Sequence, residues 1–272
     1  LELLEVTKDT PDPVPGLEMF VSDGEGNPTG WCKELAWLHF QDKMYRKIGW
    51  EPPLTLTPAL MEGFFSFLSA HGITAIADGV LEGESQLSAM KALDEAGKMN
   101  VYYDGISRFW SYQDLPEKIE ILRNYSRRYG GKHMKFNTMK LFLDGTNESG
   151  NGASLEAFQN DPAGTNFGEI KMETEELTKC FLLCNREGLD LHIHMVGDRA
   201  FRVGCDAVEQ ARKEAERLGE PWVCQPIFAH CELVDPKDMD RPARLGITVN
   251  LSCHWSGGYF GDVARDFYGY DK

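Results

Sequence analysis

From residue 58 onward, short apolar or β-branched runs alternate with longer segments of helical periodicity, and this alternation constrains the fold more than any other feature. The predicted strands are ITAIADGV (73–80), VYYDGIS (101–107), FNTMKLFLDGT (136–146), LDLHIHMVGD (189–198), PIFAHCEL (226–233) and ITVNLSCHW (247–255). The predicted helices lie at 58–72, 83–99, 115–131, 174–188, 199–219 and 235–246. Strands that alternate with helices indicate βαβ units and a parallel sheet.

Two parallel architectures compete for this pattern, an open nucleotide-binding sheet and the (β/α)8, or TIM, barrel. No Gly-x-Gly-x-x-Gly or Walker-type loop follows a predicted strand, so the open sheet has no support. In the barrel, the chemistry lies at the C-terminal ends of the strands. The polar residues expected at those ends are Asp78, Asp104, Lys140, Asp144, His192, His194, His230 and His254. We therefore predict an α/β fold, a TIM barrel represented by about six of its eight strands.

Residues 1–57 do not join the alternation. We predict that they form a loop-rich excursion that follows a missing first barrel strand, and that residues 58–272 supply barrel strands two to seven with their helices. The chain opens on LELLEVTKDTPDPVPG and stops after YGYDK without a closing element, so we expect it to be a piece of a longer protein.

The bulk composition excludes several classes of partner. The 272 residues carry a formal net charge of −15, which disfavours nucleic acid and anionic membrane surfaces. No apolar run reaches the roughly 18 residues of a membrane span, and no signal-peptide pattern opens the chain, so we expect a cytoplasmic location. None of the seven cysteines has Cys-x-x-Cys spacing, which predicts reduced thiols that mostly pack in the core.

Histidines in two consecutive predicted strands are candidates for a metal site. His192 and His194 are two apart and would share a face of their strand. Neighbouring parallel strands lie about 4.8 Å apart, so His194 and His230 at matching heights could share one ion. Zinc binds such nitrogens at about 2.0–2.1 Å. The spacing alone leaves open the alternative that both are buried histidines hydrogen-bonded to neighbours.

Lys140 lies among apolar residues of its strand, where an ammonium group is costly to bury. It could pair with Asp144, or carbon dioxide could carboxylate it to an anionic bridge between two metals; the sequence leaves both open. His254 and Trp255 follow the last predicted strand, where loops of a barrel contact substrate.

The segments KLFLDGTNESGNGA, LHIHMVGDRA, FAHCELVDPKDM and LGITVNLSCHW together resemble the amidohydrolase superfamily, over essentially the whole chain. The resemblance is closest to the branch that contains N-substituted formamide deformylase, in which a Lys-x-Phe-x-Asp-Gly strand precedes His-Ala-Ile-Gly-Asp-Arg-Ala and Glu-His-Ala. It implies that Lys140 is the fourth-strand lysine, commonly a carboxylated bridge, and that His194 and His230 are the metal histidines of the next two strands. His192 falls at a more variable position, where we expect it, like Asp144, to support the ligands or the substrate.

The resemblance implies a metal-dependent amidohydrolase that acts on carbon–nitrogen bonds other than peptide bonds, with one or two divalent ions, by preference zinc. Its partner would be a small amide-like molecule. The first-strand His-x-His is expected before residue 1, and the eighth-strand aspartate that accepts the proton is expected beyond Lys272, so we expect no catalytic acid or base within the chain. An incomplete barrel has two open sheet edges, which favour self-association into a homo-oligomer.

Two other functions stay open on the sequence alone. A barrel without a complete metal site could bind a ligand without turning it over. A lyase or isomerase could use one metal and Lys140 as a free amine. Metal content distinguishes the hydrolase from the inactive barrel.

Overall fold

The computed structural model describes residues 4–15, 18–34, 36–50, 56–81, 84–147, 149–253 and 255. Its centre is a six-stranded sheet in which each strand pairs in parallel with the next one along the chain. The strands are β3 (Ala75–Asp78), β4 (Tyr102–Arg108), β5 (Met134–Phe142), β6 (Asp190–Met195), β7 (Pro226–His230) and β8 (Thr248–Leu251). The six predicted strands and their parallel arrangement are confirmed.

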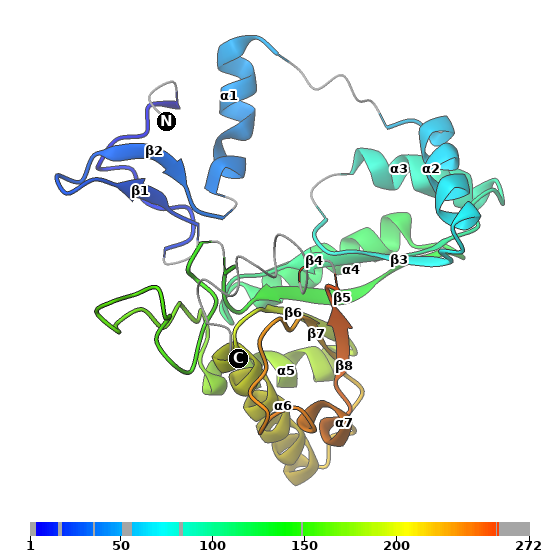
Figure 1. The fold of residues 1–272 in the computed structure, drawn as a ribbon. Helices are drawn as coiled ribbons and strands as arrows, with labels where there is room; N and C mark the ends of the chain where they lie inside the picture. The colour runs from blue at the N-terminus through cyan, green and yellow to red at the C-terminus, as the bar shows by residue number, and fades with distance from the viewer. Residues whose placement is uncertain are drawn as a thin grey trace.

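The helices that precede or connect these strands cover the outer face of the curled sheet (Figure 1). They are α2 (Pro58–Ala70), α3 (Ser85–Glu95), α4 (Leu115–Tyr129), α5 (Thr174–Glu187), α6 (Asp198–Leu218) and α7 (Arg241–Leu245). Local chemistry sets their ends: the side chain of Thr57 accepts a hydrogen bond from Leu60 N at the start of α2, and Gly188 ends α5 in the left-handed conformation. Sequential strand order with helices on one face is the arrangement of an incomplete (β/α)8 barrel, as predicted.

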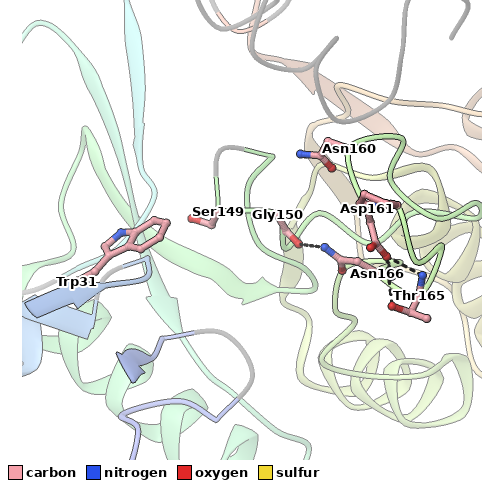
Figure 2. Close-up of a pocket in the computed structure, with 8 residues that line it drawn as sticks. Trp31, Ser149, Gly150, Asn160, Asp161, Thr165 and Asn166 are labelled. Atoms are coloured by element: carbon pink, nitrogen blue, oxygen red, sulfur yellow. Dashed lines mark hydrogen bonds between the residues drawn. The ribbon is translucent and has the colours of Figure 1, made fainter. Parts of the chain in front are cut away.

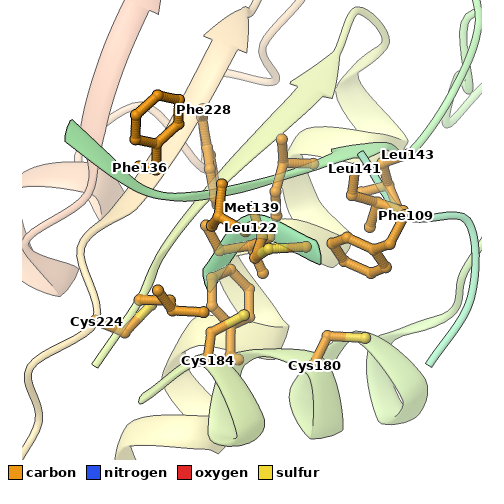
Figure 3. Close-up of a cluster of buried hydrophobic side chains, with 14 of the residues drawn as sticks. Phe109, Leu122, Phe136, Met139, Leu141, Leu143, Cys180, Cys184, Cys224 and Phe228 are labelled. Atoms are coloured by element: carbon orange, nitrogen blue, oxygen red, sulfur yellow. The ribbon is translucent and has the colours of Figure 1, made fainter. Parts of the chain in front are cut away.

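The main hydrophobic core lies between the sheet and the helices. In β5 the side chains of Met139 and Leu141 are fully buried on the helix side, together with Leu122 of α4 and Phe228 of β7 (Figure 3). All seven cysteines are free, and five are buried in this part of the chain: Cys180, Cys184, Cys205, Cys224 and Cys231. The prediction that the cysteines mostly pack in the core is therefore confirmed, and their reduced state stays a prediction.

Residues before the barrel form a small unit of their own. It contains the antiparallel pair β1 (Phe20–Ser22) and β2 (Pro28–Cys32), the 3-10 helix η2 (Ala36–Phe40) and α1 (Gln41–Ile48). Glu34 connects this unit to the long loop after β5, because its carboxylate accepts hydrogen bonds from Thr146 N at 3.1 Å and Thr146 Oγ1 at 3.0 Å. The division of the chain at residue 57 stays a prediction.

The two outer strands of the sheet, β3 and β8, pair on one side only among the strands that the structure describes. Every residue of β8 is exposed, and Leu251 is 59% exposed. Self-association through such an edge stays a prediction. Within the described residues, no helix combines the length and apolar character that a membrane span requires.

Candidate metal centre

Lys140 and His192 lie side by side on the inner, or lumen, face of the curled sheet. The two residues are paired in the register of β5 and β6, and Lys140 Nζ lies 3.1 Å from His192 Nδ1. Burial lowers the pKa of Lys140 to about 7, and no carboxylate of the described residues offsets it. Burial and the nearby Lys140 and His230 lower the pKa of His192 to about 3, so the ring is neutral at pH 7 and its Nδ1 accepts the bond.

His194 follows two residues later on the same face and is almost completely buried. Its Nε2 lies 3.2 Å from the carbonyl oxygen of Gly145, which can only accept, so we assign the ring proton to Nε2. The lone pair of the neutral ring is then on Nδ1. Burial, followed by the charges of His230 and Lys140, holds the pKa of His194 well below its usual range.

The rings of His194 and His230 are in contact, with centroids 4.6 Å apart and planes at 66°. The two residues are not at matching heights, however: His194 is opposite Ala229, and His230 is opposite Met195. Because an ordinary strand alternates its side chains, His230 would follow Met195 toward α6. That expectation of matching heights is wrong, and the contact therefore needs another cause.

The backbone of β7 supplies that cause. His230 has a φ of +76° and Cys231 a φ of +50°, the left-handed region that non-glycine residues rarely adopt. This turn interrupts the alternation at the end of β7, and the imidazole of His230 lies against His194. Its Nδ1 is 2.8 Å from Ser252 Oγ, and Trp255 stacks on the ring at 4.2 Å. His254, the neighbouring predicted substrate contact, lies outside the described residues.

The proton-accepting aspartate was predicted to follow the last residue of the chain, Lys272. Lys272 itself lies outside the described residues, which end at Trp255. The position of that aspartate, and with it the expectation that the chain has no catalytic acid or base of its own, stays a prediction.

Asp144 connects the ends of β5 and β6 rather than pairing with Lys140. Its buried carboxylate accepts hydrogen bonds from the backbone N–H groups of Ala153 at 3.0 Å, Val196 at 2.9 Å and Gly197 at 2.9 Å. A Cβ on Gly197 would lie 1.9 Å from the Ala153 carbonyl oxygen, so only glycine fits there. Burial raises the pKa of Asp144 to about 8, against the three amide donors, which favour the carboxylate. Asp144 therefore fixes the backbone directly after His194.

One charged lumen residue escaped the sequence analysis. Arg108 ends β4 and is opposite Lys140 in the register of β4 and β5. Asp104, expected at that end, is the third residue of the strand and bonds Thr138 Oγ1 at 2.7 Å, so its predicted position is wrong. The signal that could have found Arg108 is a cation directly after the predicted strand 101–107, at the end of the strand where a barrel has its chemistry.

The donor chemistry of this region fits a divalent ion of the zinc type. Among the residues that the structure describes, no group of three or more His, Cys, Asp or Glu is positioned to hold a metal. The described donors are two imidazoles in contact, His194 and His230, and the buried amine of Lys140, whose lowered pKa makes its lone pair accessible near neutral pH. Nitrogen ligands of this kind suit zinc, and Lys140 would have to complete the set.

A cavity of about 430 Å³ lies away from these residues, between β2 and the loop after β5. Trp31 lies on one side of it, and Asn160, Asp161 and Asn166 lie on the other (Figure 2). The Asp161 carboxylate is occupied by the chain itself, since it accepts from Asn166 N at 2.7 Å. The cavity contains none of the predicted ligands.

The amidohydrolase family profile matches residues 1–269. The chain belongs to the amidohydrolase family. Among curated proteins, it is 25% identical over 273 residues to the exoenzymes regulatory protein AepA of Pectobacterium carotovorum subsp. carotovorum, a match that covers 100% of this chain and 56% of AepA.

Solved structures of the same fold include two archaeal proteins described as uncharacterized metal-dependent hydrolases. The one from Pyrococcus furiosus has a TM-score of 0.63 and 20% identity, and the match covers 99% of this chain and 50% of that one. The one from Pyrococcus horikoshii OT3 has a TM-score of 0.61 and 22% identity, covering 99% and 48%. These likenesses show the fold, and the chain spans about half the length of the relatives it matches.

Proposed function

We propose that this member of the amidohydrolase family is a metal-dependent hydrolase that cleaves an amide-like carbon–nitrogen bond, other than a peptide bond, in a small molecule. The observation that carries the proposal is two neighbouring pairs of polar side chains on the lumen face: Lys140 bonded to His192, and His194 in ring contact with His230. Lys140 and His194 are also within electrostatic range of each other. The description of the Pyrococcus relatives as metal-dependent hydrolases supports the same function.

Under this proposal, His194, His230 and Lys140 hold one or two divalent ions, with zinc the expected metal. When bound, such an ion supplies a Lewis acid that lowers the pKa of water and polarises a carbonyl oxygen. Lys140 contributes either as its neutral amine or as a carboxylated side chain. We expect no nucleic acid or membrane partner, because the net charge of −15 disfavours binding to nucleic acid and to anionic membrane surfaces.

The surrounding residues position these ligands and control access to them. His192 accepts the hydrogen bond from Lys140 and so orients its Nζ. Asp144 fixes the backbone after His194. Trp255 stacks on one face of the His230 ring and so helps to hold the ring in place. Such supporting contacts are typical of metal sites, where they set the orientation of each ligand.

Zinc titration of the chelator-treated protein tests the proposal. We expect one to two zinc ions per chain by calorimetry and elemental analysis, and a loss of affinity of about 100-fold in His194→Ala or His230→Ala. His71→Ala is the matched control, because His71 is exposed at the end of α2 and bonds the Phe67 carbonyl. Binding of clearly less than one ion per chain, or equal losses in all three variants, would contradict the proposal.

The burial of Lys140 also supports a second candidate, a lyase or isomerase in which its free amine reacts with a carbonyl. The lowered pKa of about 7 gives a substantial fraction of neutral amine at physiological pH. Borohydride trapping with a small aldehyde distinguishes the two. A Lys140 adduct in the zinc-loaded protein favours the free amine, whereas a carbamate signal with ¹³C-bicarbonate and no adduct favours the hydrolase.

A further inference from the structure

Arg108 is a second cation on the lumen face; the residue is half-buried, and no described carboxylate forms an ion pair with its guanidinium. Nη1 is completely buried and has no hydrogen-bond partner among the described residues. Leaving a buried donor without an acceptor costs about 1–3 kcal/mol, and more when the group is charged. Its described contact is with an aromatic ring, since Arg108 Cζ lies 4.6 Å from the centroid of Trp110. The chain has a net charge of −15, and yet no described carboxylate or carbonyl accepts from this buried Nη1. We therefore ask which acceptor the guanidinium could bind.

Two aromatic side chains, Trp110 and Phe142, lie between Arg108 and the candidate metal centre. Trp110 stacks on Phe142, with centroids 5.9 Å apart and planes at 29°. Phe142 lies 5.1 Å from the His194 ring, and Lys140 Nζ lies 5.0 Å from the Phe142 centroid. Arg108 and Lys140 are themselves register partners on adjacent strands. Arg108 is therefore on the same face of the sheet as the proposed reaction centre, one strand away from Lys140.

The position of Trp110 is fixed before any ligand arrives. The carboxylate of Asp114 accepts hydrogen bonds from Trp110 N at 3.1 Å and from Ser111 N at 2.7 Å. Asp114 is thus occupied by the backbone and does not neutralise the guanidinium. An aromatic ring packed against an arginine restricts the orientation of its planar guanidinium group. This favours a bidentate pair of hydrogen bonds to a carboxylate.

We propose that Arg108 binds a carboxylate of the substrate, so that the substrate is a small amide that carries a carboxylate group, as an N-acyl amino acid does. The carboxylate pairs with the guanidinium, and the amide extends along Trp110 and Phe142 toward His194 and His230. The assignment of the substrate class rests on the proposed hydrolase function. The anion site itself rests on the buried Nη1 that no described acceptor satisfies.

Binding of a matched pair of probes to the chelator-treated protein tests the anion site: N-acetylglycine, which has a carboxylate, and the neutral N-acetylglycinamide. We expect calorimetry or ligand-observed NMR to show about 10-fold tighter binding of N-acetylglycine, the equivalent of about 1.4 kcal/mol. Arg108→Met should abolish this preference, and Arg108→Lys should keep part of it. The control Arg186→Gln removes an exposed arginine that pairs with Glu220 and should change nothing. Equal binding of the two probes, or an unchanged preference in Arg108→Met, would overturn the proposal.

Two further measurements separate this inference from the proposed function and from a structural role. Arg108→Met should bind zinc within about twofold of the parent protein, and its Tm should not fall, because it removes a charged group whose buried Nη1 has no described acceptor. A large loss of zinc affinity would mean that the guanidinium serves a carboxylated Lys140 instead, and would overturn the proposal. If the parent protein shows the carboxylate preference but binds no zinc, the hydrolase function fails and the anion site stands.

Discussion

The two faces of strands β5 and β6 show opposite chemistry in alternate residues of the same segments. On the outer face, Met139, Leu141 and Ile193 are fully buried among helix side chains and contain no polar group that needs a partner. On the lumen face, Lys140 and His194 are nearly as buried but keep ionisable groups in a region of low polarity. The outer face stabilises the fold, whereas the lumen face retains groups that reduce stability. Such locally unfavourable choices are expected at functional sites.

The largest effect should come from the outer face. Leu141→Ala removes a fully buried side chain from the core between the sheet and its helices. We expect it to lower the free energy of unfolding by about 2–5 kcal/mol, through lost burial and the cavity that remains. Urea denaturation measures this. A loss below about 1 kcal/mol would mean that the outer face is not the stabilising one.

The next largest loss of stability should come from Asp144, which follows β5 and accepts hydrogen bonds from the backbone after β6. In Asp144→Asn only one side-chain oxygen remains to accept hydrogen bonds from three backbone N–H groups. The new side-chain NH2 group then faces a backbone N–H group, so two donors are placed against each other. We expect a loss of about 3 kcal/mol. Asp161→Asn is the control, because Asp161 also accepts from the backbone but lies in an exposed loop. It should cost less than about 1 kcal/mol, and equal losses would contradict the account.

On the lumen face, a substitution should stabilise the protein. In the chelator-treated protein, Lys140→Met should raise the free energy of unfolding at pH 6 by about 1–4 kcal/mol, because it removes a buried ammonium group that no described carboxylate neutralises. The folded-state pKa of about 7 is below the usual 10.5, so between these values the unfolded chain holds a proton that the folded one has lost. Parent stability therefore rises with pH, and the advantage of Lys140→Met shrinks by about pH 9. Destabilisation at pH 6 would refute this.

The smallest effect concerns the backbone turn that brings His230 to the lumen. Asparagine tolerates the left-handed region, whereas a β-branched residue does not. We therefore expect His230→Val to be less stable than His230→Asn by about 1 kcal/mol in urea. Valine is more apolar than asparagine, so at this half-buried site burial alone would make His230→Val the more stable variant. A lower stability of His230→Val therefore cannot be due to burial. Equal midpoints would show that the turn stores no strain.

The fold was predictable from the sequence because local pattern and global architecture agree. Each strand is a short β-branched or apolar run, and each helix has its own periodicity and often a glycine stop. The path of the long loop after β5 could not be predicted from local sequence pattern. Its path depends on distant contacts, such as the Asp144 carboxylate with Ala153 and the Glu34 carboxylate with Thr146, which no local pattern encodes.

The candidate site was predictable in composition but not in geometry. The i, i+2 spacing placed His192 and His194 on one face, and the argument from burial cost singled out Lys140. The contact between His194 and His230 depends on an unusual φ, which residue type alone does not reveal. Arg108 was overlooked because its strand was predicted to end one residue earlier.

The central claim is that Lys140, His194 and His230 hold one cation, and anomalous diffraction at the zinc edge tests it most directly. Crystals of the zinc-loaded protein should show a peak about 2.0–2.1 Å from a ring nitrogen of both His194 and His230, with Lys140 or a carboxylate on its Nζ as a further ligand. A well-occupied zinc peak elsewhere, with these two rings bound to nothing but protein, would contradict the account.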